Sequence, residues 1–98
     1  MESFKQLISS PTPVLVDFYA DWCNPCKTMS AILVRIKELQ ADHIRIIKIN
    51  VDKNRSTAMK YSIQSIPTLM IFKDGKQLWR QSGVVGEDEL NRIIEMFK

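Results

Sequence analysis

The sequence has only two cysteines and one histidine among its 98 residues, so it is poor in the side chains that hold metal ions. A closed structural zinc site needs four ligands, whereas Cys23, Cys26 and His43 supply three. His43 also lies far along the chain from the cysteines, and we expect it to be a surface loop residue and not a ligand or base. The sequence therefore predicts no metal site within one chain, although two chains could still share a metal ion or cluster through their cysteines.

The sequence also lacks long apolar runs, and its first residues lack the pattern of a leader. No run reaches the length of a membrane span, and the first residues, Met1-Glu2-Ser3-Phe4-Lys5, have no basic region followed by an apolar stretch. Repeats, linkers and low-complexity tracts are absent. We therefore expect a single domain over 1–98, without membrane attachment and in the cytoplasm. In that compartment a CxxC pair is more often catalytic than structural.

Charge of one sign is not concentrated anywhere. Fourteen basic and eleven acidic residues give a net charge of +3 and a pI of about 9.0. Because the two kinds alternate along the chain, they predict a solvated surface and no nucleic-acid partner.

What the sequence does have is Trp22-Cys23-Asn24-Pro25-Cys26-Lys27, at the junction of two patterns. Before it, Val14 to Tyr19 is β-rich and almost entirely apolar, which is typical of a strand buried on both faces. After it, apolar residues recur at helical spacing to about Gln40. These are Met29, Ile32, Leu33, Ile36 and Leu39.

This position predicts redox chemistry. Cys23 falls near a helix N-terminus, where free amides and the helix dipole favour a thiolate. Pro25 suits an early helical turn, because its missing N–H would have no partner there. Cys26 lies one position further inside and is expected to be more buried, which makes Cys23 the attacking and Cys26 the resolving thiol. A static disulfide is the other reading, but so short a ring stabilises a fold little.

Asp17 is an unusual residue within its apolar strand. It could point to a solvated face. Alternatively, it is a buried carboxyl group near the cysteines, with its pKa raised by desolvation. The neighbouring Val16 and Phe18 do not decide between the two.

The rest of the chain predicts a short helix over Glu2 to Ser9, a strand over Ile44 to Val51, and a short helix capped by Asn54 or Ser56. A strand from Thr68 to Phe72 and a strand from Gln77 to Ser82 are joined by an Asp-Gly hairpin turn. A last helix begins at Glu87 and buries four apolar residues. These are Leu90, Ile93, Ile94 and Phe97.

Taken together, these motifs resemble the thioredoxin family over nearly the whole chain. The resemblance rests on Val16-Asp17-Phe18-Tyr19-Ala20-Asp21-Trp22-Cys23, Cys26-Lys27, Lys48-Ile49-Asn50-Val51-Asp52, Ile66-Pro67-Thr68-Leu69, Phe72-Lys73-Asp74-Gly75 and Gly83. It implies an α/β fold with a mixed sheet flanked by helices on both faces. It also implies a protein-disulfide reductase without a bound cofactor, with protein disulfides as substrates and a thioredoxin reductase as electron donor.

The resemblance assigns roles to matching residues. Asp17 would assist proton removal from Cys26, and Lys48 would lie near Asp17. Pro67 would be a cis-proline facing the disulfide, although a trans bond is the prior expectation for an arbitrary proline. The surface where substrates dock would consist of Trp22, Ile66, Pro67 and Gly83.

Four features depart from the family. Asn24-Pro25 replaces the usual Gly-Pro, so we expect these residues to tune a redox potential that cannot be carried over. Tyr19 replaces a common tryptophan with little expected consequence, and Ala31 replaces a helix-kinking proline. The chain starts at the family's first helix, which predicts four strands and an exposed edge at Ile44 to Val51. The charge on that edge favours a monomer.

Three alternatives to the reductase function remain open: an oxidant or isomerase of protein disulfides, a non-catalytic binding subunit, and a metal or cluster site shared between two chains.

Overall fold

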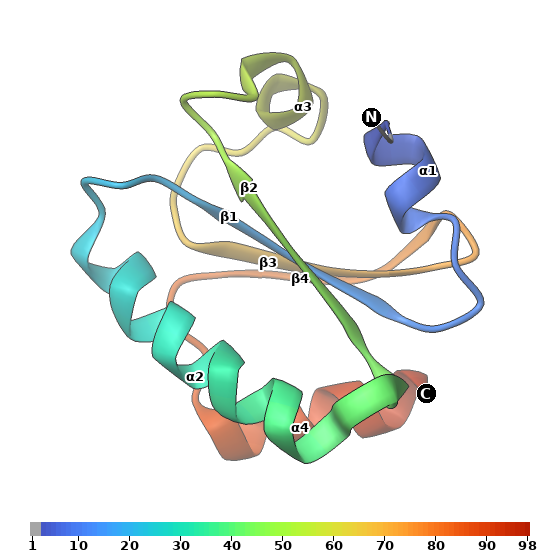
Figure 1. Ribbon diagram of the computed structural model, residues 1–98. Coiled ribbons are helices and arrows are strands. Elements are labelled where there is room, and N and C mark those ends of the chain that lie inside the picture. Colours follow the sequence, from blue (N-terminus) through green and yellow to red (C-terminus); the bar gives the residue numbers. More distant parts are fainter. Residues whose placement is uncertain (1–2) are drawn as a thin grey trace.

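The computed structural model describes residues 3–98 as a four-stranded sheet with helices on both faces (Figure 1). In chain order the elements are α1 (Phe4–Ile8), β1 (Val14–Tyr19), α2 (Asn24–Gln40), the 3-10 helix η1 (Ala41–His43), β2 (Arg45–Asn50), α3 (Arg55–Lys60), β3 (Thr68–Lys73), β4 (Lys76–Ser82) and α4 (Glu87–Phe97). The strand order is β2-β1-β3-β4. Only the β1–β2 pair is parallel. The predicted α/β fold with a mixed four-stranded sheet is confirmed.

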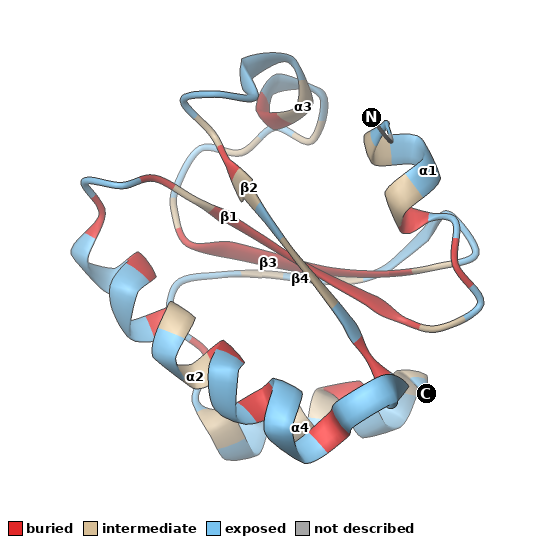
Figure 2. Cartoon of the chain, in the orientation of Figure 1, coloured by how far each residue is buried: buried red, intermediate tan, exposed pale blue. Residues whose placement is uncertain are grey.

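β1 lies inside the sheet, and this explains its apolar sequence. Its first five residues are buried (Figure 2), because β2 and β3 flank the strand and helices cover both of its faces. Every apolar residue of such a strand loses contact with water, whichever face it is on. The strand ends shortly before the cysteine segment begins, so the site starts from a strand that is buried over most of its length.

The helices divide into two pairs. α2 and α4 pack together on one face, over a core that includes Leu15, Met29, Leu33, Ile36, Leu69, Ile71, Leu90 and Ile94. α1 and α3 lie by the other face, whose core includes Ile8, Val14, Val16, Phe18, Met70 and Phe72. The alternation of strand residues between these two cores follows the period of two of a β-strand.

The predicted elements form with small changes of boundary. Asp74 and Gly75 both have positive φ, as the predicted hairpin turn requires. α1 begins after a Ser3 capping box with Gln6, and the predicted start at Glu2 lies outside the described residues. Asn54 is the N-cap of α3, but its side chain caps nothing there and donates instead to the Asn50 carbonyl.

The predicted stripe of α2 is wrong at its end. Leu39 is 59% exposed, whereas Gln40 is buried. Gln40 continues the buried row of Met29, Leu33 and Ile36, with spacings of three and four residues. Its amide donates to Asn91 Oδ1 at 2.6 Å and to Glu95 Oε1 at 3.1 Å, so a polar residue closes the seam between α2 and α4.

Among residues 3–98, no helix has the length and apolar character needed to cross a membrane.

Candidate functional site

The cysteine pair lies where β1 gives way to α2. Cys23 is the N-cap of the helix, with extended backbone angles, and its Sγ accepts a hydrogen bond from the Cys26 N–H at 3.2 Å. Pro25 occupies the first turn, as predicted. Asn24, the first helical residue, is exposed. The Cys23 sulfur is therefore held at the end of the helix whose free amides favour negative charge.

Cys23 and Cys26 are joined as a disulfide, with their Cα atoms 5.3 Å apart. Their exposed fractions are 4% and 3%, so the expected greater burial of Cys26 is not found. Both side chains pack with Ala20 and with the partly buried Tyr19, Val51 and Ile66. Burial consequently does not distinguish the two sulfurs, whereas the hydrogen bond at the N-cap does.

A loop before β3 brings Ile66 and Pro67 to the cysteines. The Ile66–Pro67 peptide bond is cis, which confirms the prediction from the family resemblance. Cys23 Sγ lies 3.8 Å from the Ile66 carbonyl oxygen. Gly83, with φ of +90°, donates its N–H to the Pro67 carbonyl at 2.8 Å. Three segments distant in sequence therefore meet around the first sulfur.

Trp22 has a large exposed side chain and directly precedes Cys23. Its side chain is 70% exposed, and its indole N–H donates to Asp52 Oδ2 at 2.9 Å. An aromatic ring held by a polar anchor presents apolar area with little freedom left to lose on binding. Asp52 was not predicted to have this function; it lies two residues after the end of β2.

Asp17 is fully buried in β1, and neither carboxylate oxygen has a hydrogen-bond partner among the described residues. Burial raises the pKa of this carboxyl from 3.8 to about 6, and the nearby Lys48 opposes the shift. The buried reading of Asp17 is therefore confirmed over the solvated one. Among residues 3–98 no other acidic side chain is buried.

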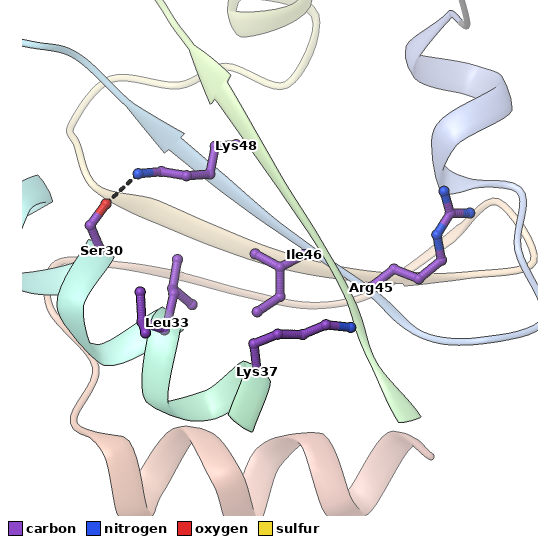
Figure 3. A pocket seen from close by; sticks show the side chains of 7 residues that line it. Ser30, Leu33, Lys37, Arg45, Ile46 and Lys48 are labelled. Carbon is purple, nitrogen blue, oxygen red and sulfur yellow. Dashed lines mark hydrogen bonds between the residues drawn. The ribbon is translucent and has the colours of Figure 1, made fainter. Parts of the chain in front are cut away.

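Lys48 pairs in register with Asp17 on the neighbouring strand, yet its side chain is exposed. Its ammonium group bonds to Ser30 Oγ (Figure 3) and lies 4.7 Å from the centre of the Tyr19 ring. The residue expected to matter little, Tyr19, thus contacts the lysine. Ser30 was not predicted, because nothing in its local sequence marks a partner eighteen residues away.

A small cavity of about 160 Å³ connects these groups to the second cysteine. It is lined by Tyr19, Ala20, Asp21, Cys26, Lys27, Ser30 and Lys48. Cys26 therefore borders a space that also reaches the lysine paired with Asp17.

No group of three or more metal-ligating side chains is found in residues 3–98, and exposed His43 lies in η1.

Known proteins are similar to this chain in both sequence and fold. The thioredoxin family model matches residues 1–96. Thioredoxin 1 of Synechococcus elongatus is 42% identical over 94 residues, covering 95% of this chain and 88% of that protein. Thioredoxin of Porphyra purpurea is 43% identical over 96 residues, covering 97% and 90%.

Among solved structures, oxidised mitochondrial thioredoxin 3 from Saccharomyces cerevisiae superposes with a TM-score of 0.85. It is 30% identical, and the match covers 95% of this chain and 86% of that one. This chain therefore belongs to the thioredoxin family of thiol–disulfide oxidoreductases, which reduce protein disulfides through a CxxC pair.

Proposed function

We propose that Cys23 makes the first attack in this reaction and Cys26 the second. The Cys23 thiolate attacks one sulfur of a substrate disulfide, that bond breaks, and the departing sulfur takes up a proton. Cys26 then gives up its proton and attacks Cys23 Sγ, which releases the second substrate sulfur as a thiol. Two electrons pass from the dithiol to the substrate, and the protein ends as the Cys23–Cys26 disulfide.

The observation that carries this order is the hydrogen bond from the Cys26 N–H to Cys23 Sγ at the start of α2. An amide donor and a helix N-terminus both stabilise a thiolate on Cys23. Cys23 also lies near the Ile66 carbonyl and directly follows the exposed Trp22. An incoming substrate would therefore meet Cys23 beside the proposed docking surface of Trp22, Ile66, Pro67 and Gly83.

Asp17 is proposed as the proton acceptor for Cys26. A buried carboxylate without partners is a better base than an exposed one, because desolvation raises its pKa towards the operating pH. Lys48 would limit that rise, since its positive charge favours the ionised carboxylate. Asn24 and Pro25, which lie between the sulfurs, would set the redox potential through the first helical turn.

The substrates are proposed to be protein disulfides, and a thioredoxin reductase would return electrons to the oxidised pair. No bound cofactor is part of this scheme. The cytoplasm suits such a cycle, because thiols are kept reduced there.

The order of the two thiols is tested with the matched variants Cys23→Ser and Cys26→Ser. Cys23→Ser should abolish disulfide reduction, because the attacking thiolate is gone. Cys26→Ser should accumulate a mixed disulfide on Cys23, because nothing resolves it. Mass spectrometry that finds substrate trapped on Cys26 in the Cys23→Ser protein, and none in the other variant, would reverse the assignment.

The chain is also proposed to be a monomer in dilute solution. Its edge strand β2 carries exposed Arg45 and Lys48, and charge on an edge opposes pairing with a second copy. Arg45→Val should increase self-association in light scattering over a concentration series. A wild-type dimer that separates when proline is placed in β2 would contradict the monomer.

A further inference from the structure

A groove lies between β2 and α2 (Figure 3). Its volume is about 460 Å³, and it is lined by Ser30, Leu33, Val34, Lys37, Arg45, Ile46 and Lys48. The four α2 residues recur at spacings of three and four, so one face of the helix forms a wall. Figure 3 shows Leu33 and Ile46 between the two elements, while the Arg45 side chain points away from them. The groove therefore has an apolar floor beside a sheet edge.

The backbone of β2 is open along this groove. Arg45 donates its N–H to Pro13, and Val51 donates to Tyr19. In a parallel pair alternate residues face the partner strand, so the odd-numbered residues of β2 bond to β1. The N–H and C=O groups of Ile46 and Lys48 consequently point outward. The Ile44 carbonyl is already occupied by Lys37 Nζ at 2.8 Å, which closes one end of the edge.

The charge at the groove has one sign. Lys37, Arg45 and Lys48 line it, and no carboxylate does. In the described part of the chain, none of these three cations forms an ion pair. Lys37 bonds to main-chain carbonyls and Lys48 to a hydroxyl. A second copy would bring the same cations against them, which costs free energy. A segment with carboxylate side chains would instead complement them.

We propose that this groove binds an extended, acidic segment of a partner protein, which adds to the sheet as a strand beside β2. Main-chain hydrogen bonds to Ile46 and Lys48 would supply affinity. Alternate side chains of the segment would contact the floor formed by Leu33, Val34 and Ile46. The carboxylates between them would point to the opposite face, on the side of the Arg45 side chain, while Lys37 and Lys48 add to the positive charge of the groove. The groove shares Ser30 and Lys48 with the cavity at Cys26. Binding there requires neither cysteine, so the test below does not depend on the order of attack proposed above.

The probe is a capped synthetic peptide of alternating valine and glutamate, about six residues long, which is the length of an ordinary strand. It is titrated into the isotope-labelled chain and followed by NMR. The amide signals of Ile46 and Lys48 should shift most. A peptide with lysine in place of glutamate should bind at least about tenfold more weakly. A glutamate peptide with N-methylated backbone amides should also lose binding, and this control requires no change to the protein.

A matched pair of variants locates the site. Val34 and Leu39 are exposed residues of α2, at 61% and 59%, and only Val34 lines the groove. Val34→Glu should weaken peptide binding about tenfold, because binding would desolvate the new carboxylate on the apolar floor. Leu39→Glu should leave it unchanged. Equal binding of both charge forms of the peptide would overturn the proposal, as would signals confined to the Cys23 surface. Concentration-dependent shifts of Ile46 and Lys48 without peptide would assign the edge to a second copy, and would also overturn it.

Discussion

The C-terminal end of α2 and the strand β1, which leads to its N-terminal end, pair their buried polar side chains to different extents. At the C-terminal end, the Gln40 amide nitrogen donates to two side chains of α4, although Gln40 Oε1 has no partner among the described residues. Lys37 caps the carbonyls of Ala41 and Ile44. At the N-terminal end, Asp17 lies in the strand that leads to the cysteines, and its carboxylate has no partner among the described residues. The first arrangement stabilises the fold. The second costs stability, and such a cost in the strand that leads to the disulfide is what the proposed role of Asp17 as a base requires.

The comparison is tested most strongly by the kinetics of Asp17→Asn. The substitution keeps the shape of the side chain but removes the proton acceptor. We expect the attack of Cys26 on the mixed disulfide to slow about a hundredfold, which is typical of losing a general base. The first attack by Cys23 should change much less. Stopped-flow measurements resolve the two steps.

The pH dependence supplies the control for that experiment. In the wild type, the second step should slow as pH falls through about 6, because Asp17 becomes protonated there. Asp17→Asn should lack this limb of the profile. If both steps keep wild-type rates and pH profiles in the variant, Asp17 has no part in proton transfer.

The same substitution should stabilise the protein at neutral pH. The folded-state pKa of Asp17, about 6, lies above its ordinary value of 3.8. The folded chain therefore binds the proton more tightly, and the free energy of unfolding falls as pH rises from about 4 to above 6. Asp17→Asn removes this loss and should gain about 1 to 3 kcal/mol at pH 7, and almost none below about pH 4. Denaturant unfolding at several pH values measures the difference.

Gln40→Leu is the matched change at the other end of α2. It removes the donor to Asn91 Oδ1 and Glu95 Oε1, and with it the unpaired Gln40 Oε1, so we expect a net loss of about 1 kcal/mol or less. The loss should be similar at about pH 5 and about pH 7, since Gln40 does not titrate. Should Asp17→Asn destabilise the fold as Gln40→Leu does, the two ends would not differ in the way described.

The smallest expected effect concerns Asn24. This exposed residue opens α2 between the sulfurs, where it influences access to the first amides. Asn24→Gly should shift the redox potential by about 10 to 30 mV in either direction, without changing which thiol attacks. A potential that stays within experimental error would make Asn24 a neutral replacement.

Local signals predicted most of the fold. The apolar run Val14 to Tyr19 predicted β1, and Asp74-Gly75 predicted the hairpin, because strand burial and turn conformation depend on adjacent residues. The change from a strand pattern to helical spacing predicted that Cys23 lies near a helix N-terminus, and in the structure Cys23 is the N-cap. The cis bond before Pro67 was predicted only by the family resemblance.

Contacts between distant segments could not be predicted. The periodicity of α2 favoured Leu39 as a buried residue. Gln40 is buried instead, and its hydrogen-bond partners lie on α4, which no local pattern indicates. Lys48 was expected near Asp17, and the two residues are indeed partners in the β1–β2 register. The Lys48 ammonium group nevertheless bonds to Ser30, because α2 packs beside β2.

The central claim is that the Cys23–Cys26 pair is a reductant of protein disulfides. An equilibrium redox titration against glutathione, or against a thioredoxin of known potential, tests it most directly. We predict a potential below about −220 mV, in the range of reducing dithiols. A potential at or above about −180 mV, the range of protein disulfide isomerase and of strong oxidants, would contradict the claim.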